Sequence, residues 1–250
     1  MRLGSMDLDQ PPILVAVFGD EPRPALVTEA RAAGMDVAEI RVDLFASPTE
    51  PHVHAALQKL EGVPVIATLR SRGEGGGWPG SEAERLQLFR SVLPRVDAVD
   101  VELESVEIRD AVVTAAHKEG KVAIVSFHDF NRTPALPQLR DIVSRACQAD
   151  ADLVKVAARA HSDADVRTLA QLLVENEARR LVVIAMGPTG AISRIFFPAL
   201  GSRLTFASLE RSTAPGQMPL RDTMAALRAF YPRYDERKRR ELDRRDGHAL

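Results

Sequence analysis

The chain contains one cysteine, Cys147, among its 250 residues, and only 5% of its residues are aromatic. A single cysteine excludes an intramolecular disulfide and is typical of proteins in a reducing compartment. No apolar run approaches the roughly 18 residues that a membrane helix needs. Residues 1–12 also lack the apolar core of a secretory signal. We therefore expect a cytoplasmic protein that does not enter a membrane.

An excess of charge of one sign is also lacking. The chain has 33 Lys and Arg residues against 35 Asp and Glu residues, which gives a formal net charge of -2. A general attraction to nucleic acid is therefore not expected. No linker rich in Pro, Gly or Ser divides the chain, so we predict one domain over residues 1–233 and a charged tail over residues 234–250. We interpret this tail as a solvated charge run. Extension of the last helix and contact with an anionic partner are the alternatives.

Short apolar, β-branched segments recur along the chain and predict buried strands. They cover residues 13–18, 37–44, 63–69, 98–103, 122–127, 151–157, 181–186 and 203–208. Amphipathic helical segments lie between them, one of which opens with a capping box from Ser81 to Glu84. Eight strands that alternate with helices over about 250 residues predict an α/β protein, a single-domain (β/α)8 TIM barrel. A doubly wound open sheet is the structural alternative.

Polar residues gather where these strands end, which in a barrel is the active face. Glu39, Arg41 and Asp43 alternate along the second strand, so they share one side of it. Asp100 and Glu102 alternate in the same way on the fourth strand. Other strands are followed by or carry Arg70, Glu74, His128, Lys155 and Arg194. Burying so many charges is costly unless they are paired or used, so we expect a functional site here.

Lys155 stands in the middle of an otherwise apolar strand, although lysine is almost never fully buried unless it is paired. Desolvation disfavours the ammonium form, which predicts an amine nucleophile that attacks a ketone or aldehyde to give an iminium. The alternative is a buried ion pair with Glu39, Asp100 or Glu102, or a side chain that reaches out of the barrel mouth.

His128, one strand earlier, is the candidate general acid and base because the ordinary pKa of histidine, about 6.5, suits proton transfer. A histidine that is only hydrogen-bonded at a strand end is the alternative. His52 and His54 lack a third ligand nearby, so no metal site is predicted.

Two glycine-containing loops could contact a ligand. Residues 75–80, GGGWPG, formally match a dinucleotide-binding motif, but Pro79 stands where the phosphate turn should be. We expect this segment to be a mobile loop that reaches over a pocket. Residues 187–190, GPTG, precede a possible helix start, and Arg194 follows, which predicts an anion site. A carboxylate and a phosphate fit this site equally well.

Taken in order, these motifs resemble those of the type I 3-dehydroquinate dehydratases, from about residue 13 to residue 230. Each match is short, but the ordered set is highly specific. Two positions depart from the family: Thr213 replaces a frequent serine, and Ala16 stands where a small hydroxyl can face the substrate. The matching segments are residues 39–43, 68–71 with 74–76, 126–130 with 133–134, 152–155, 186–187 with 193–194, and 214–217.

The resemblance implies a (β/α)8 barrel, usually a homodimer, that uses neither a metal nor an organic cofactor. Lys155 would form the iminium with the C3 ketone of the small-molecule substrate 3-dehydroquinate. His128 would remove a C2 proton and then protonate the departing C1 hydroxyl, giving 3-dehydroshikimate by syn elimination of water. Glu74 would help to place His128. The resemblance assigns substrate binding to Glu39, Arg41, Arg70, Arg194, Thr213 and Gln217.

Two other hypotheses belong to different classes. Another lysine Schiff-base barrel enzyme, such as an aldolase, would use the same amine but should favour a phosphate-binding loop. A non-enzymatic homologue would act as a binding or regulatory module, but the joint presence of Glu74, His128 and Lys155 argues against it. The sequence leaves open whether the dehydration serves aromatic amino acid biosynthesis or quinate breakdown, because both use this reaction.

Overall fold

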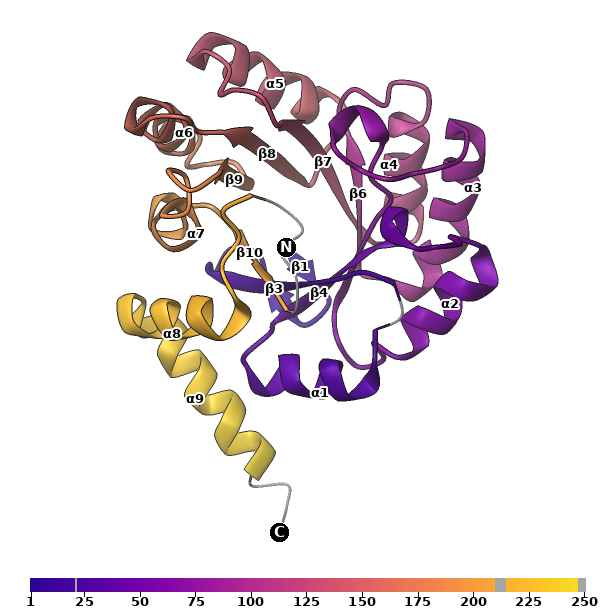
Figure 1. The fold of residues 1–250 in the computed structure, drawn as a ribbon, viewed down its shortest axis with the longest axis horizontal. Coiled ribbons are helices and arrows are strands. Elements are labelled where there is room, and N and C mark those ends of the chain that lie inside the picture. The colour runs from indigo at the N-terminus through magenta and orange to yellow at the C-terminus, as the bar shows by residue number, and fades with distance from the viewer. Residues whose placement is uncertain (21, 210–214, 247–250) are drawn as a thin grey trace.

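Parallel strands stand around the centre of the molecule, and helices surround them on the outside (Figure 1). The computed structural model describes residues 1–20, 22–209 and 215–246. The barrel strands are β3 (Ile13–Phe18), β4 (Val37–Arg41), β5 (Val65–Thr68), β6 (Ala98–Glu102), β7 (Val122–Asp129), β8 (Leu153–Arg159), β9 (Leu181–Met186) and β10 (Leu204–Ser208). The helices are α1 (Pro24–Ala32), α2 (Glu50–Gln58), α3 (Glu82–Val92), α4 (Arg109–Lys118), α5 (Leu136–Gln148), α6 (Asp163–Glu175), α7 (Ser193–Phe196), α8 (Leu220–Phe230) and α9 (Pro232–Asp246).

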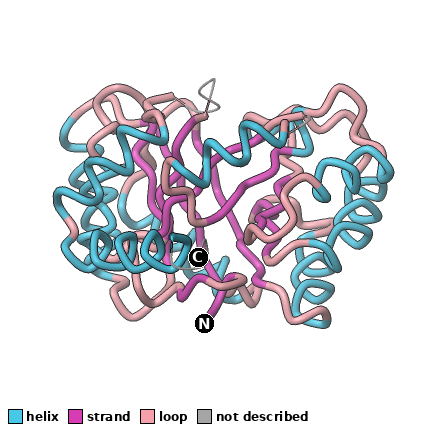
Figure 2. The backbone as a smooth tube through the Cα atoms, turned by 90° about the horizontal axis from the view of Figure 1, so that it is seen from below, coloured by secondary structure: helices cyan, strands magenta, loops and turns pink. Residues whose placement is uncertain are grey.

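The strands pair in the order β10-β3-β4-β5-β6-β7-β8-β9, and every pair in this sheet is parallel. An isolated parallel bridge between Leu181 and Ser202 brings β9 to the segment before β10, so the ring is nearly closed. Because the last strand pairs with the first, the open doubly wound sheet is excluded and the predicted (β/α)8 barrel is confirmed. Figure 2 shows the same strands from below, flanked by helices.

Alternation along the strands separates two apolar layers. On β3, Val15 and Val17 belong to the cluster inside the barrel, whereas Leu14 and Ala16 belong to the cluster between the sheet and the helices. This is the two-residue period of an extended strand, with opposite faces buried in different cores. Ala16 therefore packs under the helix layer, and the expectation that it faces a substrate is wrong.

The helices cover the barrel because each presents an apolar stripe. On α5, Leu139, Ile142, Val143 and Ala146 are buried, with the spacing of one helix face. The capping box predicted from Ser81 is present, since the Ser81 side chain accepts from Glu84 N and Glu84 bonds back to the Ser81 backbone. Within the described residues, no helix is both long and apolar enough to cross a membrane.

A short antiparallel hairpin that the sequence did not predict lies at the N-terminal end of the barrel. It consists of β1 (Arg2–Leu3) and β2 (Met6–Asp7). Leu3, Met6 and Leu8 are buried in the cluster inside the barrel. The hairpin thus closes the end of the barrel that is opposite the expected active face.

The charged C-terminal segment differs from the expected solvated run. α9 extends from Pro232 to Asp246 and so crosses residue 233, where we predicted that the domain ends and the charged tail begins. That boundary stays a prediction. Tyr234 and Lys238 are buried, and both Arg237 and Lys238 pair with Asp36. The interpretation as a solvated tail is therefore wrong for Tyr234 and Lys238, whereas Glu236 between them is exposed. Asp36 precedes β4, so these pairs fasten the end of the chain to the barrel.

Candidate active site

The interior of the barrel changes from apolar to charged along several strands, among them β6 and β8. On β8, Leu153 joins the apolar cluster inside the barrel, and Lys155 follows two positions later on the same face. In the register of the sheet, Lys155 lies beside Ser126 of β7 and Val182 of β9. The charged residues therefore form a layer towards the C-terminal ends of the strands, where a barrel enzyme has its active site.

Lys155 is 5% exposed and its amine is ion-paired. Its Nζ donates to Asp100 Oδ2 at 2.9 Å and lies 3.6 Å from Glu39 Oε1. The ammonium also lies over the Phe206 ring, 4.3 Å from its centroid. The structure thus confirms the alternative of a buried ion pair, whereas the role of the amine as a nucleophile stays a prediction.

Arg70 holds the carboxylates of this layer together. Its Nη2 donates to Asp100 Oδ1 at 2.8 Å, and its Nη1 donates to Glu102 Oε1 at 3.0 Å and to Ser126 Oγ at 2.7 Å. Burial opposes the ionisation of Asp100, but the charges of Arg70 and Lys155 outweigh it and hold the pKa of Asp100 below its usual range. Arg70 therefore fixes the carboxylate that contacts the Lys155 amine.

His128, near the end of β7, pairs with Glu74 from the short helical turn Arg72–Glu74. Glu74 Oε2 accepts from the His128 backbone N–H at 2.8 Å and lies 2.9 Å from His128 Nδ1. Burial and the nearby cations hold the pKa of His128 well below 6.5. Burial raises the pKa of Glu74 to about 8, although Arg70 acts in the opposite direction. We assign the Nδ1–H tautomer, which donates to Glu74 and leaves Nε2 as a neutral base.

The raised pKa of Glu74 predicts a pH-dependent cost in stability. Above a pH of about 4.5 the unfolded chain loses this proton, while the folded protein keeps it until pH reaches about 8. The folded state thus binds more protons in this window, so its stability falls as pH rises. The unfolding free energy of the wild type should therefore fall between acidic and alkaline buffer by about 1–3 kcal/mol more than that of Glu74→Gln.

Urea unfolding of the wild type and of Glu74→Gln at about pH 5 and about pH 9 measures this difference. Glu177→Gln, at an exposed position, is the matched control and should follow the wild type. Equal pH slopes for Glu74→Gln and the wild type would show that Glu74 ionises as an ordinary carboxyl.

Arg194 is a buried cation for which the described residues supply no carboxylate partner. It is 3% exposed, and burial lowers its pKa to about 10. Its Nη1 donates weakly to Phe206 O at 3.4 Å. Within the described parts of the chain, its Nε and Nη2 have no hydrogen-bond partner. A buried guanidinium with unused donors is suited to an anionic ligand, in agreement with the predicted anion site.

Local structure around α7 explains how Arg194 is held. Ser193 Oγ accepts from Ala185 N at 3.1 Å, which fixes the start of α7 to β9. A side chain at Gly190 would approach Ala185 O to 2.3 Å, so the turn before α7 requires glycine. Gly187 N donates to Pro215 O at 3.1 Å, so the segment that contains Gln217 packs against the same turn.

The other predicted site residues reach the same place, with one exception. Glu39 Oε1 accepts from Thr68 Oγ1 at 2.8 Å, and Arg41 forms a two-bond pair with Asp43. Thr213 lies outside the described residues. One cavity is lined by Glu39, Arg41, Arg70, Glu74, His128, Lys155, Arg194 and Gln217, together with Val17, Gly75, Phe130, Ala157, Ile184, Met186 and Phe206.

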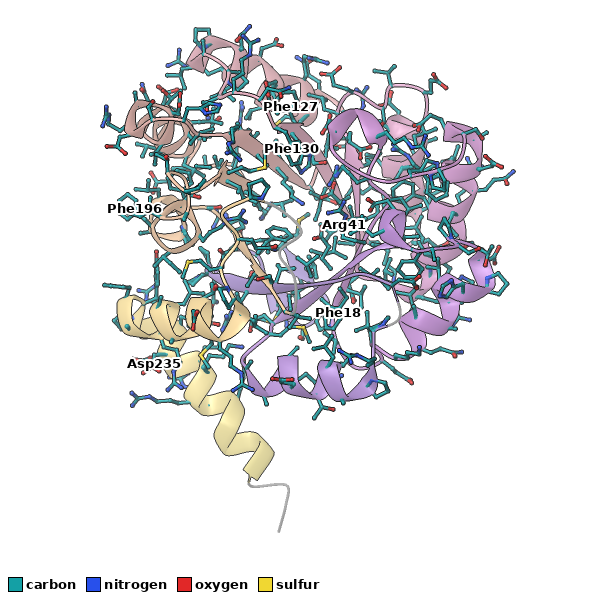
Figure 3. The ribbon with its side chains drawn as sticks, viewed as in Figure 1. Phe18, Arg41, Phe127, Phe130, Phe196 and Asp235 are labelled. Carbon is teal, nitrogen blue, oxygen red and sulfur yellow. The ribbon has the colours of Figure 1, made fainter. Side chains whose placement is uncertain are left out.

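The glycine-rich loop after β5 is packed against the site. Gly75 lines the cavity, and a side chain at Gly76 would approach Arg70 O to 2.1 Å. Gly77 N donates to Asp43 Oδ2 at 3.0 Å. Figure 3 shows Arg41 inside the ring of elements and Phe196 on its outer side. Gly75 thus contributes to the wall of the cavity, as expected for a loop next to a pocket, whereas the predicted mobility of the loop stays a prediction.

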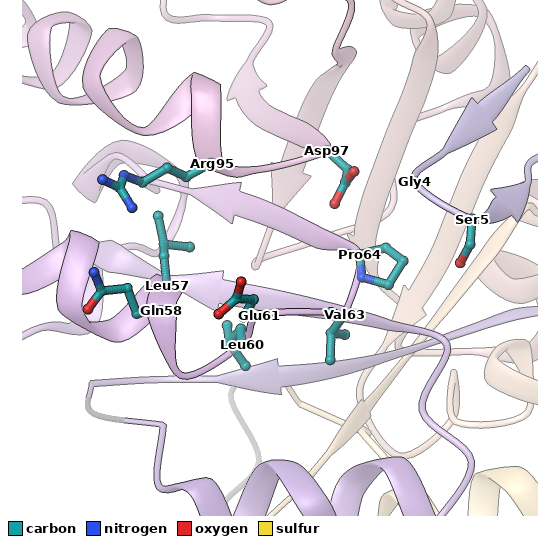
Figure 4. A pocket seen from close by; sticks show the side chains of 11 residues that line it. Gly4, Ser5, Leu57, Gln58, Leu60, Glu61, Val63, Pro64, Arg95 and Asp97 are labelled. Atoms are coloured by element: carbon teal, nitrogen blue, oxygen red, sulfur yellow. The ribbon is translucent and has the colours of Figure 1, made fainter. Parts of the chain in front are cut away.

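A larger cavity lies at the opposite end of the barrel, near the hairpin and the starts of β5 and β6. Its volume is about 610 Å³, compared with about 60 Å³ for the cavity around Lys155. Figure 4 shows its lining side chains, which include Gln58, Glu61, Arg95 and Asp97. Asp97 is already engaged, since its Oδ2 accepts from Val65 N at 2.9 Å. Chemistry, and not volume, therefore identifies the smaller cavity as the candidate active site.

Sequence reasoning gave Asp100 no role beyond pairing with lysine, and it missed Ser126 and Arg85. The strand pattern placed Asp100 on one face with Glu102, but it did not show that Arg70 binds both carboxylates. Arg85 could have been found from its helix position, because it shares one face with Leu88, Phe89 and Val92, although arginine is usually exposed. In the structure Arg85 is fully buried and contacts Glu102.

Comparisons with known proteins agree with this geometry. A family model described as type I 3-dehydroquinase matches residues 14–233. The 3-dehydroquinate dehydratase of Methanococcoides burtonii is 37% identical over 231 residues, which cover 91% of this chain and 98% of that relative. The 3-dehydroquinate dehydratase of Methanosarcina acetivorans is 36% identical over 88% of this chain and 95% of that relative.

Two solved structures show the same similarity in three dimensions. The 3-dehydroquinate dehydratase of Aquifex aeolicus superposes with a TM-score of 0.81 at 30% identity, covering 88% of this chain and 99% of that one. The type I enzyme of Clostridium difficile, solved with covalently modified comenic acid, superposes with a TM-score of 0.82 at 28% identity. The alignment covers 90% of this chain and 95% of that one.

Proposed function

The chain belongs to the type I 3-dehydroquinase family, a family of hydro-lyases, and we propose that it dehydrates 3-dehydroquinate to 3-dehydroshikimate. One observation in the structure supports this most strongly. One cavity is lined by the buried amine of Lys155, by His128, whose pKa is lowered by burial, and by the guanidinium of Arg194, whose Nε and Nη2 bind no described residue. Together they match a substrate that has a ketone, an acidic carbon and a carboxylate.

The reaction we propose begins at Lys155. The Lys155 ammonium releases one proton, and the free amine attacks the C3 ketone. That proton returns to the carbinolamine hydroxyl, which leaves as water and gives an iminium. The iminium withdraws electrons from C2, so removal of a C2 proton leaves a neutral enamine instead of a bare carbanion. Asp100 and Glu39, which contact the ammonium form, hold Nζ in the cavity before the attack.

His128 then carries one proton through two steps. Its Nε2 accepts the C2 proton, and the resulting imidazolium gives that proton to the departing C1 hydroxyl, which leaves as water. Hydrolysis of the conjugated iminium consumes one water, releases 3-dehydroshikimate and regenerates the Lys155 amine. Glu74 fixes the ring through Nδ1 and so keeps Nε2 available.

The remaining residues bind the substrate in this proposal. Arg194, Gln217 and Thr213 hold the carboxylate. Glu39, Arg41 and Arg70 contact ring hydroxyls. The terminal nitrogens of Arg70 also bind Asp100, Glu102 and Ser126. No step calls for a metal or an organic cofactor, because the lysine itself supplies the electron sink.

Arg194→Met should separate binding from stability. Loss of the guanidinium removes a carboxylate contact, so KM should rise by a factor on the order of 10². It also removes a buried charge that lacks a carboxylate partner, so the protein without substrate should become about 1–3 kcal/mol more stable. Steady-state kinetics and urea unfolding measure the two effects. Arg140→Met, at an exposed pair with Glu175, is the control and should change neither strongly.

Incubation of the purified protein with 3-dehydroquinate tests the proposed activity. Dehydration creates a conjugated ketone, whose ultraviolet absorbance reports turnover. Formation of this product at a catalytic rate would support the dehydratase, whereas cleavage of a carbon–carbon bond would favour an aldolase. Absence of any reaction with folded protein would favour a non-enzymatic homologue.

We also propose that the protein acts in the cytoplasm as a homodimer in the shikimate pathway, with a role in aromatic amino acid biosynthesis. The family resemblance supports this assembly and role. Light scattering of the purified protein measures its mass against the 27.4 kDa of one chain. A mass near that of one chain at working concentration would contradict the homodimer.

A further inference from the structure

Arg85 on α3 is a charged residue of the outer helix layer, yet it is 0% exposed. Its helix neighbours Glu84 and Arg90 are exposed, as expected for the solvent side of a surface helix. A fully buried arginine carries a large desolvation cost unless its contacts compensate for it. The contacts of Arg85 therefore indicate why it is buried.

The guanidinium of Arg85 reaches the outer side of the charged layer in the barrel. Its Nη2 donates to Glu102 Oε2 at 2.7 Å and to Ser105 Oγ at 2.6 Å. Ser105 Oγ in turn donates to the same Glu102 oxygen at 2.9 Å. Glu82, which is partly exposed, lies 3.2 Å from Nη2. Glu102 is thus held from outside the barrel by a cation and a hydroxyl.

The contacts of Glu102 continue to the Lys155 amine. Glu102 Oε1 accepts from Arg70 Nη1 at 3.0 Å, and Arg70 Nη2 donates to Asp100 Oδ1 at 2.8 Å. Asp100 Oδ2 accepts from Lys155 Nζ at 2.9 Å. Positive and negative groups therefore alternate without a break from α3 to the proposed nucleophile, and all of them are buried.

Charges in such a chain depend on one another because little water screens them. Burial opposes the ionisation of Glu102, but Arg70 and Arg85 outweigh it and hold the pKa of Glu102 below its usual value. Without Arg85, Glu102 would depend on Arg70 alone among the arginines. Arg70 would then be drawn towards Glu102 and away from Asp100.

We propose that Arg85 is a positioning residue for the chemistry at Lys155, acting through Glu102, Arg70 and Asp100 from outside the active-site cavity. Arg85 does not line the cavity around Lys155. Its effect on turnover rests on the proposed function. Its effect on the reactivity of the Lys155 amine is independent of the substrate.

Arg85→Met removes the charge and keeps much of the side-chain volume, Arg85→Lys keeps the charge, and Arg90→Met on the same helix is the control. Acetylation of Lys155 by acetic anhydride, followed by peptide mass spectrometry across a pH series, measures amine reactivity without substrate. In Arg85→Met the pH midpoint should move up by on the order of 0.5–1 unit, because loss of a cation lets the carboxylates retain the ammonium form more strongly. Arg85→Lys should restore most of this shift, and Arg90→Met should show none.

Turnover of 3-dehydroquinate gives the second measurement. For Arg85→Met, kcat should fall about tenfold with a much smaller change in KM, since Arg85 itself does not line the cavity. Arg85→Lys should recover only part of kcat, because its ammonium lies one bond short of the position of Nη2, the nitrogen that contacts both Glu102 and Ser105.

Thermal unfolding establishes the folded fraction of each variant. Wild-type pH midpoints in folded Arg85→Met would overturn the proposal and leave Arg85 as a residue that only fastens α3 to β6. Failure of both Arg85 variants to fold would overturn it in the same way. If the wild type does not dehydrate 3-dehydroquinate while Arg85→Met still shifts the acetylation midpoint, the proposed function is wrong and the positioning role stands.

Discussion

Replacing Lys155 by methionine should reduce the dehydration of 3-dehydroquinate by a factor on the order of 10⁴ or more, while the protein stays folded. Methionine keeps most of the apolar stem that packs near Phe206 but has no amine. The variant therefore cannot form the iminium, and none of the other described residues that line the cavity carries an amine side chain. Ultraviolet absorbance of the product measures the loss.

Borohydride reduction in the presence of 3-dehydroquinate tests the same step directly. In the wild type, peptide mass spectrometry should find the reduced adduct on Lys155, and Lys155→Met should carry none. Lys118→Met, at an exposed position of α4, is the control and should keep both turnover and the adduct. Turnover at the normal rate in folded Lys155→Met would refute the Schiff-base mechanism.

Replacing His128 by glutamine should lower kcat by about 10²–10⁴-fold without preventing imine formation at Lys155. The glutamine side chain can still bond to Glu74 but cannot accept the C2 proton. The iminium should therefore accumulate, and borohydride should trap it at least as efficiently as in the wild type. His161→Gln, at an exposed position that bonds to Asn131, is the control.

This second result would separate the roles of the two residues. If His128→Gln lost both turnover and the trapped adduct, His128 would be needed for the attack on the ketone and not only for the elimination. If it kept normal turnover, another group would be the base.

The pH dependence of wild-type turnover follows from the same histidine. The base must be neutral, and burial with the nearby Arg70 and Lys155 holds the pKa of His128 well below 6.5. Protonation of His128 should therefore reduce turnover only at a pH well below 6.5. On the acidic side of the pH–activity profile, the decline should begin at a lower pH than it would with an exposed histidine as the base.

The amino-acid sequence by itself determined the architecture and most of the cavity. β3 and β9 have the predicted bounds, because each is a continuous branched apolar run. The second strand ends at Arg41 and not at residue 44, since Val42–Leu44 form a helical turn that lets Asp43 pair with Arg41. Pattern shows which face of a strand a residue shares, so it located Glu39, His128 and Lys155 at one end of the barrel.

Tertiary structure decided which groups meet. Lys155 contacts Asp100 from two strands away, and Asp36 receives Arg237 and Lys238 from the last helix. Arg85 is buried although arginine is usually exposed, and it shares its helix face with the buried Leu88 and Phe89. These outcomes depend on the order and closure of the strands, which set distances between residues far apart in the chain. Local periodicity fixes the direction of a side chain relative to its own element, whereas its partner and its charge state depend on what the closed barrel brings to the other side.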